Sequence, residues 1–116
     1  METAPTRTGR KATGRVTYEV DVEVDAAIAD EYRDWLRGHI AEMLALPGFT
    51  GAQLYMILEP PPSAGCIRLC VHYRLHDQAA LDAYLREHAP RMRADGVARF
   101  GDRFRASRRV LAGIRR

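Results

Sequence analysis

A strict alternation of apolar and polar residues over Val16–Val24 is the most regular pattern in this chain of 116 residues. Because successive side chains of a β-strand point to opposite faces, a period of two indicates a strand with one buried face. The apolar face would hold Val16, Tyr18, Val20, Val22 and Val24. Residues 50–59 and 66–76 are also predicted to be strands, and an arginine-rich segment ending at Leu111 is predicted to be the fourth.

Between the first two strands the apolar period changes to three and four residues, which is typical of an amphipathic helix. This helix is predicted to follow an N-cap at Asp25 and to stop at Pro47-Gly48. Its apolar stripe consists of Ile28, Tyr32, Trp35, Leu36, His39, Ile40, Met43 and Leu44. Gly38 lies inside it at a cost of about 1 kcal/mol relative to Ala, and we expect it to allow close approach of another group.

A second helical region is predicted after Asp77, which is expected to cap it, with Leu81, Tyr84 and Leu85 on its buried stripe. A corner at His88-Ala89-Pro90 would separate this helix from a shorter one, and Phe100-Gly101-Asp102 would form a turn before the last strand. The resulting order, β-α-β-β-α-β, predicts an α+β fold of the ferredoxin-like type. Its four-stranded antiparallel sheet would have the order 4-1-3-2 and both helical regions on one face.

The length allows one domain, predicted over residues 16–112, with a disordered basic tail at 1–15 and a basic end at 113–116. The net charge of +3 is unevenly distributed. Residues 1–15 contribute +3, residues 16–90 contribute −7 and residues 91–116 contribute +7. No apolar run is long enough for a spanning helix and none resembles a signal peptide, so we expect a cytoplasmic protein that makes no membrane contact.

The predicted strand order gives the charge imbalance a structural explanation. Acidic residues on the outer face of the first strand would lie beside basic residues on both of its neighbours, and such cross-strand pairs are stabilising. The acids are Glu19, Asp21 and Glu23, and the basic residues are Arg68, His72 and Arg74 on one side and Arg103, Arg105 and Arg109 on the other. RNA-binding modules with this element order need exposed aromatic residues where this chain has acids, so nucleic-acid binding is not expected.

Several segments resemble DUF4286, a bacterial family of unknown function. They are VTYEVDVEV around Tyr18, the helix segment from Trp35 to Phe49, Tyr84-Leu85 with His88-Ala89-Pro90, and the block from Arg99 to Leu111. The resemblance implies a ferredoxin-like fold of the dimeric α/β-barrel type, in which two sheets pack face to face. It fits the segment 50–59, which is apolar on both faces and therefore expected to be covered on both sides. We expect a homodimer formed through the outer sheet face.

Two histidines are candidates for chemistry. His39 follows Trp35 by one helical turn, an arrangement that resembles the first helix of dimeric α/β-barrel proteins of the ether-degradation type, and imidazole can act as a general base near neutral pH. The alternative is a histidine at the edge of the stripe, bonded to backbone or water. His88 is either a corner residue that satisfies backbone groups or, by analogy with haem-binding members of the superfamily, an iron ligand.

Neither a cofactor nor a metal is expected. Cys66, Cys70 and His72 share one strand face, but the two cysteines are about 13 Å apart on an extended strand, too far for a disulfide or a shared tetrahedral site. Reduced, buried cysteines are the better interpretation. The sequence contains no phosphate-binding loop, nucleophile elbow or paired metal motif, so it does not decide whether the protein is an enzyme.

Three hypotheses follow. The first is an uncharacterised dimeric α/β-barrel protein that binds a small molecule or serves as an interaction module. The second, implied by the superfamily, is a cofactor-independent oxygenase or isomerase with a pocket between the first helix and the sheet. The residues expected to line that pocket are Tyr18, Trp35, His39, Tyr73 and His88. The third is a regulator that binds nucleic acid through the arginine-rich C-terminus.

Overall fold

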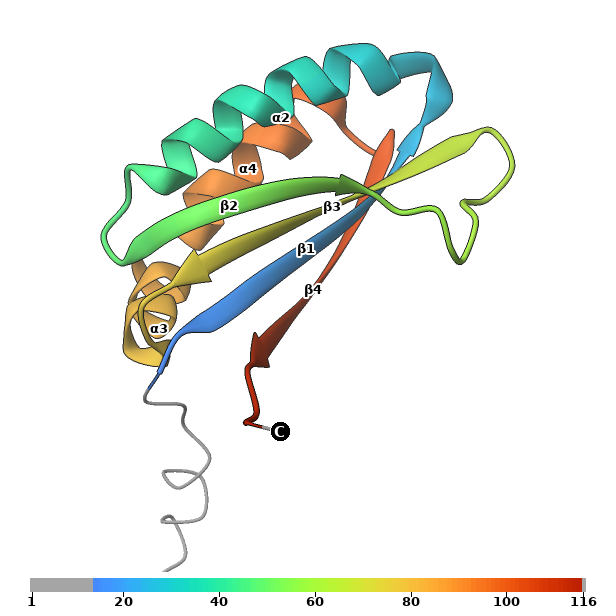
Figure 1. Ribbon diagram of the computed structural model, residues 1–116. Coiled ribbons are helices and arrows are strands. Elements are labelled where there is room, and N and C mark those ends of the chain that lie inside the picture. The colour runs from blue at the N-terminus through green and yellow to red at the C-terminus, as the bar shows by residue number, and fades with distance from the viewer. Residues whose placement is uncertain (1–13, 116) are drawn as a thin grey trace, which may run out of the picture.

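The computed structural model describes residues 14–115, which form four strands, three α-helices and one 3₁₀ turn (Figure 1). The predicted tail at 1–15 lies outside the described residues except for its last two positions. The elements are β1 Val16–Asp25, the 3₁₀ turn η1 Ala26–Ile28, α2 Ala29–Leu44, β2 Phe49–Met56, β3 Cys66–Leu75, α3 Gln78–Glu87, α4 Ala89–Phe100 and β4 Phe104–Ala112. Within this part of the chain, no helix is long and apolar enough to cross a membrane.

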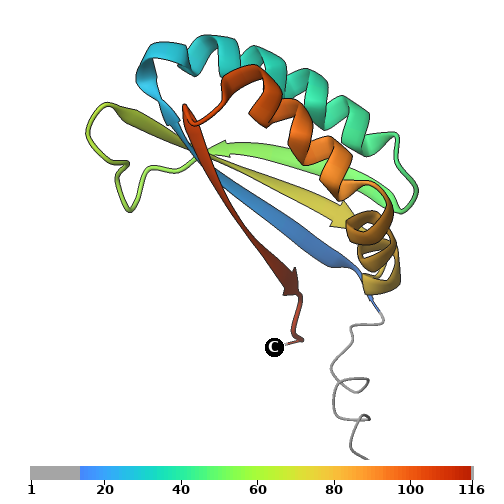
Figure 2. The ribbon, with the colours of Figure 1, turned by 180° about the vertical axis from the view of Figure 1, so that it is seen from behind.

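The strands form one antiparallel sheet in the order β2-β3-β1-β4, which confirms the predicted order. The two longest helices, α2 and α4, cover one face of the sheet, while the described chain leaves the other face uncovered (Figures 1 and 2). The fold is therefore the ferredoxin-like α+β fold, as predicted.

The helices differ from the sequence prediction in detail. Asp25 precedes η1, but its side chain makes no capping bond; its carboxylate instead accepts a hydrogen bond from Arg103 Nε at 2.8 Å. The competing guanidinium of Arg103, immediately before β4, explains why this predicted cap was wrong. Asp77 does cap α3, accepting from the Ala80 amide at 2.8 Å. The helix after His88 has 12 residues against 10 in α3, so it is not the shorter of the two.

The core lies between the inner sheet face and the helices. Alternate residues of β1 and β3 point into it, as the period of two predicts, and α2, α3 and α4 close it from above. Its aromatic members include Tyr18, Tyr32, Tyr73, Tyr84 and Phe100, each 7% exposed or less.

The outer sheet face carries the cross-strand charge pairs that the strand order predicts. Glu19 accepts a hydrogen bond from Arg109 Nε at 2.9 Å, and Arg105 lies 3.6 Å from Glu23. Arg68 lies 4.0 Å from Asp21. Arg74 was expected beside these acids, but the register places it opposite Thr17, and its guanidinium lies against Gly51.

Candidate functional site

A cavity of about 50 Å³ lies between the inner face of the sheet and the helices α2 and α4. Every strand except β2, and each of the three α-helices, contributes to its wall. The wall consists of Tyr18, Val20, Val22, Tyr32, Trp35, Leu36, His39, Met43, Val71, Tyr73, Tyr84, Met92, Arg93, Gly96, Phe104, Ala106 and Arg108. It contains no carboxylate, hydroxymethyl or thiol side chain. Covalent catalysis by serine or cysteine therefore has no group in this wall to carry it.

Aromatic rings pack against one another around the cavity. The Trp35 indole stacks on the His39 imidazole, with ring centroids 4.7 Å apart and planes inclined by 21°. On the sheet side, the Tyr18 ring lies 6.2 Å from Tyr73 and 5.7 Å from Tyr84. Gly96 on α4 makes room for the indole, since a Cβ there would lie 3.1 Å from Trp35 Cη2. Aromatic contacts of this kind fix ring orientation and make the wall stiff.

His39 is the basic group of the cavity. Burial lowers its pKa, and the charge of Arg108 lowers it further, while Glu42 and Asp95 oppose the shift. The imidazole is therefore neutral at neutral pH. Its Nδ1 is buried and has no hydrogen-bond partner among the described residues. Buried polar atoms without a partner are uncommon in native proteins, so this nitrogen is available to a bound molecule.

The phenols of the cavity are hydrogen-bond donors. Burial raises the pKa of Tyr32 and of Tyr84 to about 12 and also raises the pKa of Tyr73. These groups keep their protons throughout the physiological range. The Tyr18 hydroxyl accepts a hydrogen bond from Arg93 Nη2 at 2.9 Å, which ties α4 to the central strand.

Four of the five residues proposed from the sequence line this cavity, namely Tyr18, Trp35, His39 and Tyr73. His88 does not. It lies at the junction of α3 and α4, where its Nδ1 is 2.7 Å from Arg91 Nη2 and its backbone amide donates to the Tyr84 carbonyl. The structure thus places His88 at the corner between the two helices, with its ring outside the cavity wall and its side chain making no capping bond to the backbone. A ligand-binding role for the other four stays a prediction.

Sequence reasoning missed Arg93 and Arg108, which also line the cavity. Only Arg103, Arg105 and Arg109 were assigned a face of the sheet, because the acids of β1 offered them partners, and Arg108 was left unassigned. The signal was present, because Arg108 is two and four residues after Ala106 and Phe104, both apolar, and alternation places all three on the inner face.

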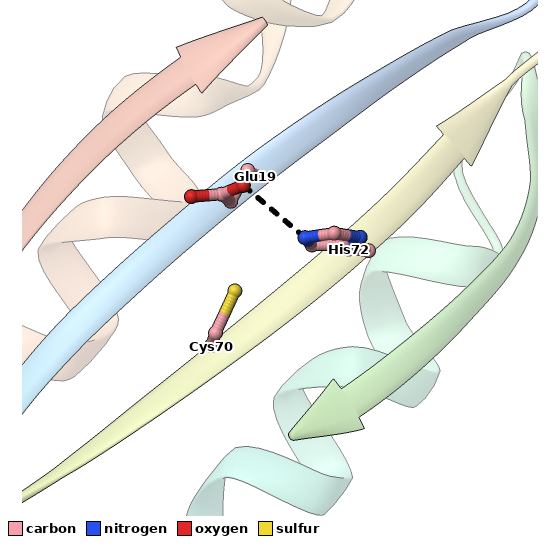
Figure 3. A group of neighbouring side chains, drawn as sticks. All are labelled: Glu19, Cys70 and His72. Atoms are coloured by element: carbon pink, nitrogen blue, oxygen red, sulfur yellow. Dashed lines mark hydrogen bonds and ion pairs between the residues drawn. The ribbon is translucent and has the colours of Figure 1, made fainter. Parts of the chain in front are cut away.

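On the opposite face of the sheet, Glu19, Cys70 and His72 form a second cluster (Figure 3). Their donor atoms lie within 4.8 Å of one another, and they are the one such metal-compatible set in residues 14–115. Cys66, the third residue of the β3 face considered from the sequence, is not part of it.

The bonds within the cluster explain it without a metal. Glu19 Oε1 lies 3.2 Å from His72 Nε2 while Oε2 accepts from Arg109, so both carboxylate oxygens are engaged. Burial and the neighbouring Asp21 carboxylate raise the pKa of Cys70 to about 12, so its thiol is protonated. A metal would have to displace His72 from Glu19 and deprotonate Cys70. We therefore assign the cluster to ion pairing across β3, β1 and β4.

Solved structures with the same fold align with nearly the whole chain at low sequence identity. SnoaB from Streptomyces nogalater, a cofactor-independent oxygenase solved as a variant, is 14% identical with a TM-score of 0.66; the match covers 89% of this chain and 96% of that one. An ethyl tert-butyl ether degradation family protein from Bacillus halodurans is 13% identical, with a TM-score of 0.64 and coverage of 86% and 99%. Rv0793 from Mycobacterium tuberculosis is 20% identical, with a TM-score of 0.61 and coverage of 88% and 97%. At these identities the likeness shows the fold alone.

No curated protein matches the chain by sequence. Residues 15–114 match the family described as Domain of unknown function (DUF4286). The matched segment includes every strand and helix of the structure. The protein therefore belongs to the DUF4286 family.

Proposed function

We propose that this protein is a cytoplasmic homodimer that binds one small, largely apolar molecule per chain in the cavity between α2, α4 and the sheet. The observation that carries the proposal is the unpartnered Nδ1 of a neutral His39 in a largely apolar wall that contains several aromatic rings. A ligand with one polar atom would satisfy that nitrogen and bury its remaining surface against the rings. Ligand sites are commonly built this way, from apolar walls with a few placed polar groups.

The size of the cavity limits the ligand. A volume of about 50 Å³ exceeds the roughly 10–15 Å³ that one water requires, but it is below the roughly 150 Å³ of an engineered cavity that binds benzene. Binding of a ring must therefore enlarge the cavity. Met43 and Met92 in the wall have flexible side chains that can repack around a guest.

The outer sheet face supports the homodimer. Tyr55 on β2 is 47% exposed and its ring lies 5.1 Å from His72, on the face that the described chain leaves uncovered. The same face holds the matched charges around Glu19, which a second sheet could cover without leaving a buried charge unpaired. The free thiols of Cys66 and Cys70 suit a reducing cytoplasm.

A second candidate function is a cofactor-independent oxygenase or isomerase, and one specific observation favours it. The cavity combines a neutral imidazole with protonated phenols. A neutral imidazole can remove a proton from a carbon next to a carbonyl, and a phenol can donate a hydrogen bond to the oxyanion that results. His39 would be the base and a tyrosine hydroxyl the donor. The nucleic-acid hypothesis has less support, because Arg103, Arg105 and Arg109 are paired with acids of β1.

Native mass spectrometry of the full-length protein tests the first proposal. We expect twice the mass of one 13.1 kDa chain and a co-purified small molecule on each chain. His39→Ala should lose that molecule, whereas His88→Ala, which alters a histidine outside the cavity, should retain it. A monomeric mass at micromolar concentration would contradict the dimer. Equal ligand retention by the two variants would contradict the cavity.

Deuterium exchange tests the catalytic alternative. In D₂O, a general base at His39 should speed deuterium incorporation into the methyl group of acetophenone, which NMR follows directly. The His39→Ala variant should fall to the rate of buffer alone, with His88→Ala unchanged. If the wild-type protein gives no acceleration at saturating acetophenone, proton abstraction by His39 is excluded for this class of substrate.

A further inference from the structure

We propose that the ligand of this cavity is an anion, a small apolar carboxylic acid whose carboxylate is bound by Arg93 and Arg108. This inference rests on the proposed ligand-binding function and names its chemical class. The two arginines come from different elements, α4 and β4, and both line the same cavity. Helix α4 leads into β4 through the turn at Gly101 (Figure 2). Arg93 reaches the Tyr18 hydroxyl, and Arg108 is paired with Val20, two residues further along the same face of β1.

The first argument is the lack of carboxylate partners. Neither Arg93 nor Arg108 lies within ion-pair distance of an acid in the part of the chain that the structure describes. Arg93 donates to the neutral Tyr18 hydroxyl, which positions its guanidinium without neutralising it. By contrast, the neighbouring Arg109 on β4 is bonded to Glu19, and Arg99 on α4 lies 3.5 Å from Glu31.

The second argument is the composition of the wall. Two guanidinium groups and no acid among its residues give the cavity a net positive charge. The charge of Arg108 acts on groups inside the cavity. It lowers the pKa of His39, and it partly offsets the rise in pKa that burial causes at Tyr32, Tyr73 and Tyr84. The acids whose charges act on His39, Glu42 and Asp95, lie outside the wall.

The third argument is the fit between these groups and a carboxylate. A guanidinium offers planar, paired donors that match the two oxygens of a carboxylate, and such charge-assisted bonds are stronger than neutral ones. Both arginine residues are exposed overall, so the carboxylate would lie at the mouth of the cavity. The apolar body of the acid would then point inward, between Trp35 and Tyr73. A neutral analogue of the same shape would keep the apolar contacts but lose the charged ones.

The experiment is an NMR titration of the full-length ¹⁵N-labelled protein with sodium benzoate and with benzamide, its neutral isostere. Sodium acetate and sodium butyrate are included because their smaller apolar groups require less enlargement of the cavity than a ring does. We expect saturable shifts of cavity amides with the carboxylates, and binding of benzamide weaker by about tenfold, the effect of losing one charge-assisted bond. Arg93→Gln and Arg108→Gln should each weaken benzoate binding by about tenfold. Arg99→Gln is the matched control, because it removes the same charge from α4 outside the cavity and should leave the affinity unchanged.

The outcomes separate this inference from the proposed function. If benzoate and benzamide bound with equal affinity and shifted only cavity amides, the proposed preference for an anion would be wrong. The proposal that the cavity binds a ligand would still hold. The inference would also be overturned if Arg99→Gln weakened benzoate binding as much as Arg93→Gln and Arg108→Gln do. The loss of one positive charge anywhere on the protein would then explain the weaker binding. If none of the four compounds shifts the cavity amides and native mass spectrometry shows no bound molecule, the ligand-binding function itself fails. Circular dichroism of each variant identifies a failure to fold. Arg93→Lys or Arg108→Lys, which keeps the charge but not the paired donors of a guanidinium, then provides the second variant.

Discussion

Two glycines in helices have opposite roles. Gly38 on α2 was expected to allow close approach of another group, but a Cβ there would meet nothing within 4 Å, so the prediction was wrong. Its only effect is the cost of glycine in a helix. Gly38→Ala should therefore stabilise the protein by about 1 kcal/mol, measured as the free energy of unfolding in urea.

The control for this substitution is Gly96→Ala on α4. A Cβ at Gly96 would lie 3.1 Å from Trp35 and 3.2 Å from Phe104, both of which line the cavity. Overpacking of this kind costs about 1–3 kcal/mol. If both substitutions stabilise the protein, the indole is not confined as described.

The Glu19 carboxylate makes stability depend on pH. Burial alone would raise its pKa, but the hydrogen bond from Arg109 and the charges of Arg109 and His72 lower it below the ordinary value of 4.5. A group with a depressed folded pKa stabilises the protein above its unfolded pKa, and this contribution is lost as pH falls through the folded value. The difference in unfolding free energy between wild type and Glu19→Gln should thus be constant above about pH 6 and shrink below 4.5.

Glu31→Gln is the matched control for Glu19→Gln. Glu31 pairs with Arg99 at 3.5 Å, but its side chain is 60% exposed against 6% for Glu19. Exposed pairs contribute little, so this variant should follow the wild-type pH profile. A pH-independent difference for Glu19→Gln would show that the carboxylate charge is not what stabilises the sheet.

The position of a side chain relative to the cavity was predictable where a local sequence pattern determined which way the side chain points. His39 and Trp35 were placed at the cavity because helical periodicity put them on the face toward the sheet. His88 could not be placed in the same way, because a corner between two helices has no period. Arg108 was left unplaced because charge complementarity, and not strand alternation, was used to place the arginines of the last strand.

At the scale of elements, the start of α3 depends on one side chain. Asp77 accepts a hydrogen bond from the Ala80 amide, which satisfies one of the free donors at the helix N-terminus. Asp77→Ala should cost about 1 kcal/mol in unfolding free energy, whereas Asp77→Asn should retain most of the cap. Equal losses in the two variants would indicate that the charge near His76, 3.4 Å away, stabilises this segment and that the cap does not.

The elements themselves were largely predictable from the period of their apolar residues. Strand β2 was the exception, since it ends at Met56 and not at residue 59. The backbone beyond it continues toward Pro60, and proline cannot donate to a sheet ladder. The Asp25 cap failed because its competitor, Arg103, is 78 residues away along the chain. Local patterns carry no information about such a partner.

At the scale of the whole molecule, the outer sheet face should determine the oligomeric state. Tyr55→Glu would place an unpaired carboxylate beside His72 and Glu19 in a covered interface, where removing a charge from water is costly. We expect this variant to have the mass of one 13.1 kDa chain by light scattering at a concentration where wild type has twice that mass.

Val97→Glu tests whether any added charge has the same effect as Tyr55→Glu. Val97 is 58% exposed on α4, on the helical side of the molecule. This variant should remain dimeric, and its dissociation would mean that the interface lies on the helices.

The strand order and the charge pairing across the sheet were predictable because each follows from element order and alternation. The cavity was only partly predictable. The walls formed by the sheet and by α2 follow from periodicity. The contribution of α4 depends on how closely that helix packs at Gly96, where a Cβ would meet Trp35 and Phe104. Packing distance of this kind is a property of the assembled core, not of any one segment.

Arg108 and Arg109 are adjacent in β4, and they serve opposite faces of the same edge strand. A carboxylate that draws Arg108 inward would shift the strand that also presents Arg109 to Glu19. Occupancy of the cavity and self-association would then be thermodynamically linked, and each would strengthen or weaken the other by the same factor. Dilution experiments with and without benzoate measure this factor as a change in the dimer dissociation constant. An unchanged constant would mean that β4 is rigid enough to isolate its two faces.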